Sequence, residues 1–526
     1  ANTSSCTFSR KQTPMDMALL QSLPEQWVLF FIALVSVICL RAWKRSQGGS
    51  SRKLPPGPAP MPIIGNLHQL GRLPHRALRD LAQIHGPVMQ LRLGTAPTVV
   101  MSSAAAAWAA LKEHDLDCCT RPVSPGPKLL TYGLKNVAFA PFGAYWRDIR
   151  KLLVVELLSA RRVKAAWFAR QEQVDKLMST LRGAGPEPVA LDGHILRLAD
   201  GIIGTVAFGQ IYGSSMFSES KNFQHALDEA AEVLSSSSAE DFFPKAIGRV
   251  IDRVTGVVAR RQRIFEQLDG FFEMVIEHHL DPKRATPDGA GDLVDVLIAH
   301  WKDPRHGFTR DHVKAILFDT FIAGIDTSSV TITWAMSELM RCPRVLSKAQ
   351  AEVRAVVGAE GRVQPEHVAK LSYMRMVVKE TLRLHPPATM LVPRETIRDI
   401  QVGGYDVPAK TRIYVNAWAI GRDPANWPND PEEFNPDRFE GSEVDLKGEH
   451  PQLLPFGTGR RICPGISMGL ATVEFTLASL LCNFQWALPD GMLPEDVSME
   501  EQGKINFHRK TPLLLVPTAY PSPVTP

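Results

Sequence analysis

One short stretch of the sequence constrains the structure more than any other: Pro455-Phe456-Gly457-Thr458-Gly459-Arg460-Arg461-Ile462-Cys463-Pro464-Gly465, here called the cysteine loop. An apolar stretch with helical spacing, residues 466–481, follows directly, so Cys463 precedes a helix. The positive end of the helix dipole and its free backbone N–H groups favour a thiolate at such a position. Gly457 and Gly459 permit a tight turn that passes close to a flat ligand.

These features together favour a metalloporphyrin site. A thiolate is an axial ligand of haem iron, Phe456 is a flat apolar neighbour, and Arg461 is a fixed cation for a propionate. The remaining cysteines lack such a setting: Cys6, Cys39, Cys118, Cys119, Cys342 and Cys482. Zinc is disfavoured, because the sequence has no Cys-x-x-Cys pair, no His-Glu-x-x-His motif and no other matching ligand set.

A second motif overlaps the cysteine loop. Gly465-Ile466-Ser467-Met468-Gly469 fits the Gly-x-Ser-x-Gly elbow of serine hydrolases, and Asp490 or Asp496 with His508 follows in the required order. The elbow needs a buried strand directly before it, whereas the residues before Gly465 are typical of a loop. A hydrolase is therefore the weaker alternative.

A single long helix is expected over residues 311–341, where helical spacing continues until Pro343. At about 1.5 Å per residue it would extend roughly 46 Å, enough to cross a domain. Weak helix formers interrupt its middle at Ala323-Gly324-Ile325-Asp326-Thr327-Ser328-Ser329. We expect the Thr327 hydroxyl to bond the carbonyl of Ala323, which opens a polar notch in a buried helix. Close helix packing against Gly324 is the alternative explanation.

A structural ion-pair network is expected near the cysteine loop. Glu380 and Arg383 lie three residues apart on one helix face, just before Pro386 and Pro387 end that helix. A second arginine, Arg438, follows in an aromatic loop that contains proline. We expect Glu380, Arg383 and Arg438 to join beneath the cysteine loop.

The composition describes an ordinary globular chain. It has 526 residues, 44% hydrophobic and 22% charged, with 59 Lys and Arg against 55 Asp and Glu. This bias is too small to indicate nucleic-acid binding, and seven cysteines without close, even spacing indicate no disulfide framework. Short strands are expected at residues 88–93, 98–101, 392–396 and 412–415, with helix over most of the remainder. The predicted fold is mainly α with a small β part, in one large domain at 63–526.

The N-terminal region predicts a membrane anchor. After an N-terminal segment (residues 1–26), only Ser36 is polar between Trp27 and Leu40, and the run reaches Trp43 if Arg41 extends its charge to the interface. Basic residues cluster after this run, which favours an anchor at 27–43 with the C-terminal part in the cytosol over a cleaved signal peptide or a core helix. A basic and Pro-rich hinge, residues 44–62, then forms a stiff spacer.

Taken together, these segments resemble the cytochrome P-450 superfamily, from Leu54 to about Pro517. The cysteine loop fits the family pattern Phe-x-x-Gly-x-Arg-x-Cys-x-Gly at Phe456, Gly459, Arg461, Cys463 and Gly465. The resemblance also covers an acid-alcohol pair, a Glu-x-x-Arg element and a Trp-x-x-x-Arg element, which match Asp326 with Thr327, Glu380 with Arg383, and Trp146 with Arg150. The motifs of the chain are similar to those of the plant microsomal branch of this superfamily.

The resemblance implies a haem-thiolate monooxygenase with haem b (iron protoporphyrin IX). It implies Cys463 as axial iron ligand, Thr327 and Asp326 as catalytic residues, and a haem site that includes Trp146, Arg150, Arg394, Phe456, Arg461 and Gly465. It also implies residence in the endoplasmic reticulum membrane through a single span, with the catalytic domain facing the cytosol. No dinucleotide or Walker motif is present, so electrons are expected from an NADPH-cytochrome reductase.

The expected substrates are O2 and a small hydrophobic plant metabolite. Several segments resemble the aldoxime-converting enzymes of cyanogenic glucoside synthesis, which implies conversion of 4-hydroxyphenylacetaldehyde oxime to 4-hydroxymandelonitrile. The alternatives are a hydroxylase of a terpenoid, a phenylpropanoid or another aldoxime, and a non-catalytic haem-binding sensor. We expect the substrate pocket to draw on residues 124–128, 316–320 and 388–392.

Overall fold

The computed structural model describes residues 52–209, 212, 221–235, 238–284, 291–503 and 505–520. The predicted anchor, residues 27–43, lies outside the described residues. Within them, two helices are long and apolar enough to cross a membrane, Arg310–Arg341 and Ile466–Asn483. Both are mostly buried, so they belong to the core of the domain.

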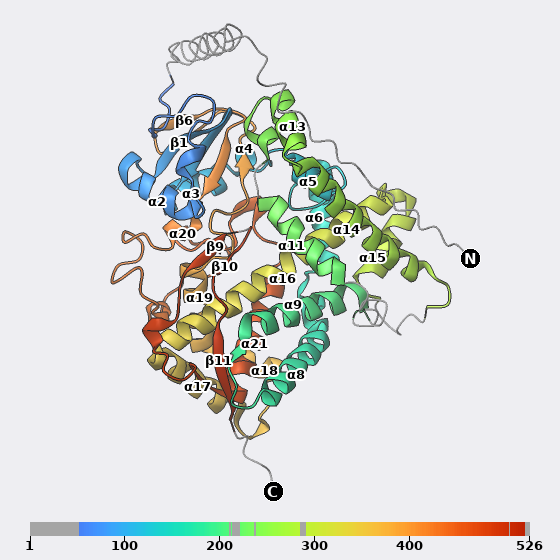
Figure 1. Ribbon diagram of the computed structural model, residues 1–526, viewed down its shortest axis with the longest axis vertical. Coiled ribbons are helices and arrows are strands. Elements are labelled where there is room, and N and C mark those ends of the chain that lie inside the picture. Colours follow the sequence, from blue (N-terminus) through green and yellow to red (C-terminus); the bar gives the residue numbers. More distant parts are fainter. Residues whose placement is uncertain are drawn as a thin grey trace, which may run out of the picture. The chain divides into compact units, whose positions relative to one another are not determined.

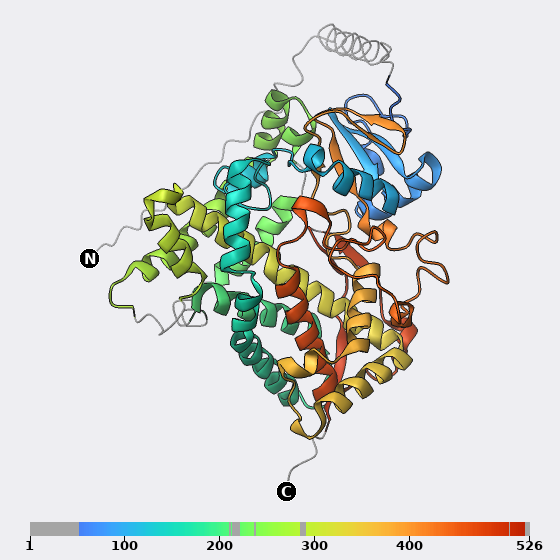
Figure 2. The ribbon, with the colours of Figure 1, turned by 180° about the vertical axis from the view of Figure 1, so that it is seen from behind.

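Helices make up most of the described structure (Figure 1). In chain order they are α2 (Pro74–His85), α3 (Ala104–Trp108), α4 (Asp115–Cys118), α5 (Pro125–Leu130), α6 (Ala144–Glu156), α7 (Ala160–Ala165), α8 (Trp167–Gly183), α9 (Leu191–Phe208), α11 (Lys221–Ser235), α12 (Ala239–Phe242), α13 (Lys245–Val254), α14 (Val257–Leu280), α15 (Leu293–Lys302), α16 (Arg310–Arg341), α17 (Pro343–Val357), α18 (Pro365–Val368), α19 (Ser372–Leu384), α20 (Ala417–Ile420) and α21 (Ile466–Asn483). The long helix is α16, which packs against α9 and α21 (Figure 2).

The strands form a small β part, as predicted. The main sheet has the order β1 (Val88–Leu93), β2 (Ala96–Met101), β7 (Arg412–Val415) and β4 (Arg394–Glu395). Strand β2 runs parallel to β7 with Val100 opposite Tyr414, which joins two segments about 300 residues apart in the sequence, blue and orange in Figure 1. The smaller sheets pair β3 (Val189–Ala190) and β8 (Phe484–Ala487) with β11 (Leu514–Ala519), β5 (Ile400–Val402) with β6 (Tyr405–Val407), and β9 (Glu501–Gly503) with β10 (Phe507–Arg509).

One predicted strand is shorter than expected. Of residues 392–396, only Arg394 and Glu395 pair in the sheet. Pro393 has no N–H to give to a ladder, and the carbonyls of Val392 and Pro393 accept hydrogen bonds from the Arg121 side chain instead. The backbone groups that a longer strand would use are therefore absent or already bonded.

The middle of α16 departs from a regular buried helix for both of the reasons considered. The Thr327 hydroxyl donates to the Ala323 carbonyl at 2.7 Å, as predicted. Gly324 also lies against α9, because a Cβ there would come within 2.6 Å of the Ile203 side chain. Ala323 is exposed although the helix is buried on either side of it, so this part of α16 borders an internal space.

The network of Glu380, Arg383 and Arg438 forms with its acid completely buried. Arg383 donates to both Glu380 oxygens at 2.7 Å, and Arg438 donates to Oε1 at 2.8 Å. The remaining Arg383 donors reach carbonyls of residues 421, 431 and 433. The network thus fastens segment 421–438 to α19; its hydrogen bonds among the described residues do not extend to the cysteine loop.

We predict that Glu380→Gln destabilises the protein by about 3–5 kcal/mol, because it leaves two buried guanidinium groups without their counter-charge. Urea unfolding followed by circular dichroism measures this free energy. Glu366→Gln, at an exposed position on α18, is the control and should stay within about 0.5 kcal/mol of the unchanged protein. Equal stability of the two variants would contradict a structural role for the network.

Candidate functional site

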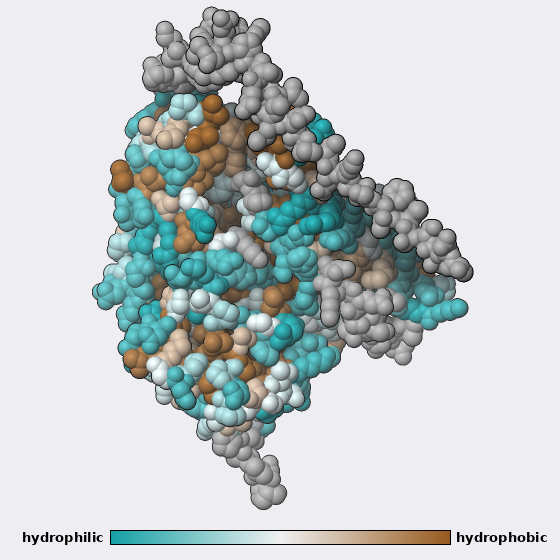
Figure 3. All heavy atoms as spheres, viewed as in Figure 1, coloured by the Kyte–Doolittle hydropathy of each residue, from teal (hydrophilic) through white to brown (hydrophobic). Residues whose placement is uncertain are grey.

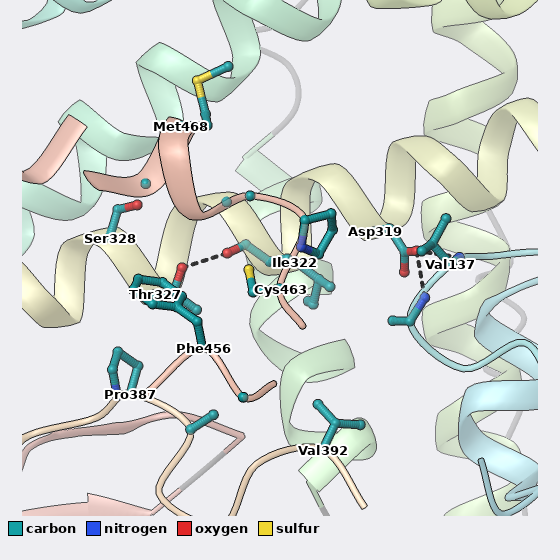
Figure 4. A pocket seen from close by; sticks show the side chains of 18 of the residues that line it. Val137, Asp319, Ile322, Thr327, Ser328, Pro387, Val392, Phe456, Cys463 and Met468 are labelled. Carbon is teal, nitrogen blue, oxygen red and sulfur yellow. Dashed lines mark hydrogen bonds between the residues drawn. The ribbon is translucent and has the colours of Figure 1, made fainter. Parts of the chain in front are cut away.

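An internal cavity of about 350 Å³ lies where α9 and α16 meet the cysteine loop. Its walls also include residues 137–139, segment 387–394 and the first turns of α21. The lining is mostly apolar, from residues such as Ile202, Ile203, Val206, Leu234 and Phe139. Figure 4 shows the Thr327 side chain on α16 and the sulfur of Cys463 in this space.

The cysteine loop holds Cys463 through backbone contacts. The Cys463 N–H donates to the Phe456 carbonyl at 2.9 Å, which closes the turn under the thiol. Gly459 has a φ of +70°, and a Cβ there would come within 2.3 Å of the Leu111 carbonyl. Only glycine fits that position, because both the backbone angle and the close approach exclude a side chain. Gly457 and Phe456 line the cavity beside the thiol, as the predicted site requires.

The Cys463 thiol differs from the prediction in one respect. Burial raises its pKa, while a hydrogen bond from the Gly465 N–H and the charge of Arg150 lower it. Burial has the larger effect, so the helix end that was expected to favour the thiolate does not by itself lower the pKa of this thiol. A metal ion bound to sulfur replaces the proton outright. We therefore expect Cys463 to be a thiolate when a metal ion is bound to its sulfur.

Four arginines, three of them buried and Arg150 half-buried, surround one side of the cavity. All of them line it: Arg121, Arg150, Arg394 and Arg461. Most of their hydrogen bonds end on backbone carbonyls. Arg461 donates to residues 119, 137 and 140, Arg121 to residues 138, 392 and 393, and Arg150 to residue 462. Only Arg394 pairs with an acid in the described structure, Asp115 at 2.9 Å.

This arrangement leaves an excess of positive charge. Burial, together with the neighbouring guanidinium groups, lowers the pKa of Arg121 well below its usual range, and it lowers that of Arg461 to about 9. Buried cations are costly unless anions compensate them. An iron porphyrin brings two propionates to the arginines and an iron atom to the thiol, and its flat ring suits the apolar walls. The residues present therefore fit a haem.

Arg121 was not among the predicted site residues. Its guanidinium lies in the same cluster as Arg150, Arg394 and Arg461, and its pKa responds to all three. The sequence around it, Cys119-Thr120-Arg121-Pro122, carries no pattern that indicates burial. Its place in the cluster depends on contacts with residues 138, 392 and 393, which are distant in sequence.

Trp146 packs against the guanidinium groups of Arg461 and Arg150. Its indole N–H donates to the Val137 carbonyl at 3.0 Å, and its ring faces the guanidinium carbons of Arg461 at 4.1 Å and Arg150 at 5.4 Å. Trp146 is not among the cavity-lining residues of the described structure. Its contacts position the two arginines, and direct contact with a propionate stays a prediction.

The acid-alcohol pair divides between two environments. Thr327 faces the cavity, whereas the Asp326 carboxylate accepts a hydrogen bond from Asn506 at 2.6 Å and pairs with His508 at 3.0 Å. Asn506 itself lines the cavity, and the His508 side chain is 34% exposed. Asp326 thus lies between solvent and the cavity, without lining it.

Two other expectations can be compared with the structure. Residues 124–128 were expected at the pocket, but they begin α5, which packs against α11 and α14; Asp319, Thr320, Ala388 and Val392 do line the cavity. The hydrolase elbow is not formed, because a 3-10 turn at residues 459–461, rather than a strand, precedes Ser467. Residues 124–128 were expected to form a loop at the pocket, whereas residues 125–130 form helix α5.

The comparisons with known proteins agree with this geometry. The cytochrome P450 family model matches residues 55–516. The chain is 61% identical to 4-hydroxyphenylacetaldehyde oxime monooxygenase of Sorghum bicolor, over 95% of this chain and 97% of that protein. It is 47% identical to 2-methylbutanal oxime monooxygenase of Manihot esculenta, over 96% and 99%.

A solved structure supports the same fold. A zebrafish cytochrome P450 with progesterone superimposes with a TM-score of 0.71 at 24% identity, covering 85% of this chain and 99% of that one. The family match spans the whole described domain, including the cysteine loop, α16 and the arginine cluster. The chain belongs to the cytochrome P450 family.

Proposed function

We propose that this cytochrome P450 monooxygenase converts 4-hydroxyphenylacetaldehyde oxime to 4-hydroxymandelonitrile, with haem b bound at Cys463. One observation carries the haem site: Cys463, Thr327 and the buried arginines share one apolar cavity. When bound, haem supplies activation of O2 with electrons from outside the chain. The aldoxime substrate is supported by the names of the two relatives at 61% and 47% identity.

The proposed reaction has two balanced parts. The aldoxime loses water and becomes the nitrile, with the carbon skeleton unchanged. The carbon beside the nitrile is then hydroxylated: one oxygen atom of O2 enters the C–H bond, and the other leaves as water with two electrons and two protons. The enclosed apolar walls suit a small aromatic molecule and exclude competing water.

The residues have distinct proposed roles. Arg121, Arg150, Arg394 and Arg461 hold the propionates, Phe456 and Gly465 shape the cysteine side, and Trp146 supports the arginines. Thr327 holds water in the cavity through the oxygen lone pairs that remain after its hydroxyl donates to Ala323. Asp326 supplies protons from the side of His508, where the chain meets solvent.

Electron transfer is proposed to come from NADPH-cytochrome reductase. Three basic side chains near the cysteine loop and α6 are exposed, Arg147, Lys151 and Arg460. Their charge suits an acidic electron donor, because complementary charges steer two proteins together. Arg460 belongs to the cysteine loop, and Arg150 of α6 donates to the Ile462 carbonyl of the same loop at 2.6 Å, so the proposed docking surface lies close to Cys463.

The proposed location is the endoplasmic reticulum membrane, with the domain on the cytosolic side. Helix α13 supports membrane contact: Ile247, Val250, Ile251 and Val254 form an exposed apolar stripe at helical spacing. The charges beside the stripe are basic, Lys245, Arg249 and Arg253, whereas the acid of this helix, Asp252, is buried. Figure 3 shows hydrophobic residues gathered at the end of the molecule that carries α13.

We predict that the purified, reduced protein gives the red-shifted Soret band of thiolate ligation with carbon monoxide, and that Cys463→Ser loses it. The wild-type protein with reductase and NADPH should form 4-hydroxymandelonitrile from the aldoxime. Formation is measured by liquid chromatography against 2-methylbutanal oxime, a terpenoid and a phenylpropanoid. A band without turnover of any substrate would favour the sensor, and turnover of another substrate class would overturn the proposed substrate.

We predict that Thr327→Ala diverts electrons from product to peroxide, because the cavity loses a hydroxyl that orders water. Product per NADPH should fall on the order of tenfold. Thr327→Ser, which keeps the hydroxyl, should restore most of the coupling. Peroxide and product are measured together, and unchanged coupling in Thr327→Ala would remove Thr327 from the proton path.

We predict that α13 touches lipid when the full chain is reconstituted in vesicles with anionic lipid. A fluorophore on Ile251→Cys should be quenched by brominated acyl chains, because burial of the apolar stripe carries it below the headgroups. The same label on Glu366→Cys, exposed on α18, is the control. Equal quenching at the two positions, or none at Ile251→Cys, would contradict the proposed contact.

A further inference from the structure

Asp319 is a buried acid on α16 that the proposed chemistry does not use. It lies in the wall of the cavity, two turns before Thr327, and is 7% exposed. Its carboxylate accepts hydrogen bonds from the side chain of Asn136 at 2.6 Å and from the backbone N–H groups of Val137 at 2.7 Å and Ala138 at 3.1 Å. Figure 4 shows Asp319 reaching from α16 to Val137.

Two backbone peptide groups and the side-chain amide of Asn136 connect this carboxylate to two guanidinium groups. The peptide between Val137 and Ala138 gives its N–H to Asp319, and its carbonyl accepts from Arg461 at 3.1 Å. The carbonyl of Ala138 accepts from Arg121 at 3.1 Å, and the N–H of the same peptide, on Phe139, donates to the Asn136 side chain at 3.3 Å. The Asn136 amide in turn donates to Asp319. Each route therefore runs from anion to cation through aligned amide dipoles.

Such chains of hydrogen bonds strengthen one another in a buried site. Burial raises the pKa of Asp319 to about 6, whereas hydrogen bonds from Asn136, Ala138 and Val137 act to lower it. A buried carboxylate is costly, so its presence on an otherwise apolar stretch of α16 calls for a compensating interaction. Asp319 has no direct ion pair among the described residues, so the compensation comes through the two amide routes to Arg461 and Arg121.

We propose that Asp319 is a positioning residue for the haem: it fixes and polarises the carbonyls of Val137 and Ala138, which hold the guanidinium groups of Arg461 and Arg121. The proposal rests on the proposed haem site. On this proposal, an acid on α16, the helix that lines the cavity, helps to set the electrostatic potential at the propionates. Removing the negative charge makes that side of the cavity more positive, which stabilises the reduced iron, and loosens the two arginines.

The test compares holoproteins. Asp319→Asn should shift the haem reduction potential to more positive values and speed haem transfer to apomyoglobin about tenfold, because it weakens several buried hydrogen bonds. The matched control is Asp311→Asn, which removes a half-exposed acid from the same helix; this acid pairs with Lys135, the residue before Asn136. Asp311→Asn should change neither quantity.

A charge exchange separates positioning from a merely structural role. Combining Asp319→Asn with Asn136→Asp returns the carboxylate to the same hydrogen-bonded pair and should restore the potential and most of the haem retention. If Asp319→Asn does not fold, Asn136→Ala alone, which cuts only the route to Arg121, should give a smaller shift in the same direction. An unchanged potential with an intact thiolate band would overturn the inference, whereas loss of that band from the wild-type protein would overturn the haem site itself.

Discussion

The site depends on one electrostatic constraint: four arginine side chains line an apolar cavity, with Asp115 as the one acid that pairs with them in the described structure. Backbone carbonyls orient these guanidinium groups but bring no full negative charge. The fold therefore holds the arginines in place for an anion that the described residues do not supply. The same loop that supplies Arg461 supplies Cys463, so one short stretch determines both the anion side and the metal side of the site.

In helix α16, residues that are close in sequence have different roles: Gly324 packs against α9, and Thr327 faces the cavity. Gly324 allows the close approach of α9 through Ile203, and Ala323 leaves room in the cavity. Thr327 then turns its hydroxyl to the free side of the Ala323 carbonyl. A regular apolar helix would close this space, because side chains of ordinary size would fill it. The weak helix formers in the middle of α16 are thus a condition for having a cavity at the thiol.

The parts of the structure that local patterns encode could be predicted. The ends of α16 and α21 follow from periodicity and prolines, strands β1 and β7 from alternation, and the turn at Cys463 from its glycines. The pKa of the Cys463 thiol could not be predicted, because the helix dipole follows from the local sequence whereas burial depends on the tertiary structure. Arg121 was missed, and Asp319 was expected only as part of the pocket range 316–320 without its hydrogen bonds, for a related reason. Many of their partners are carbonyls and N–H groups of other loops, and every residue has such groups.

The family can be predicted from local sequence motifs, whereas the substrate cannot. The motif residues surround the thiol and the arginine cluster, so they fit a haem and do not define the organic molecule. The other walls of the cavity come from α9, from Leu234 on α11 and from segment 387–392, which carry ordinary apolar residues. Exchanging one such residue for another changes the shape of the cavity without disturbing any motif. The preferred substrate can therefore change while the cysteine loop and its arginines are unchanged. It has to be inferred from similar proteins of known substrate and from turnover measurements.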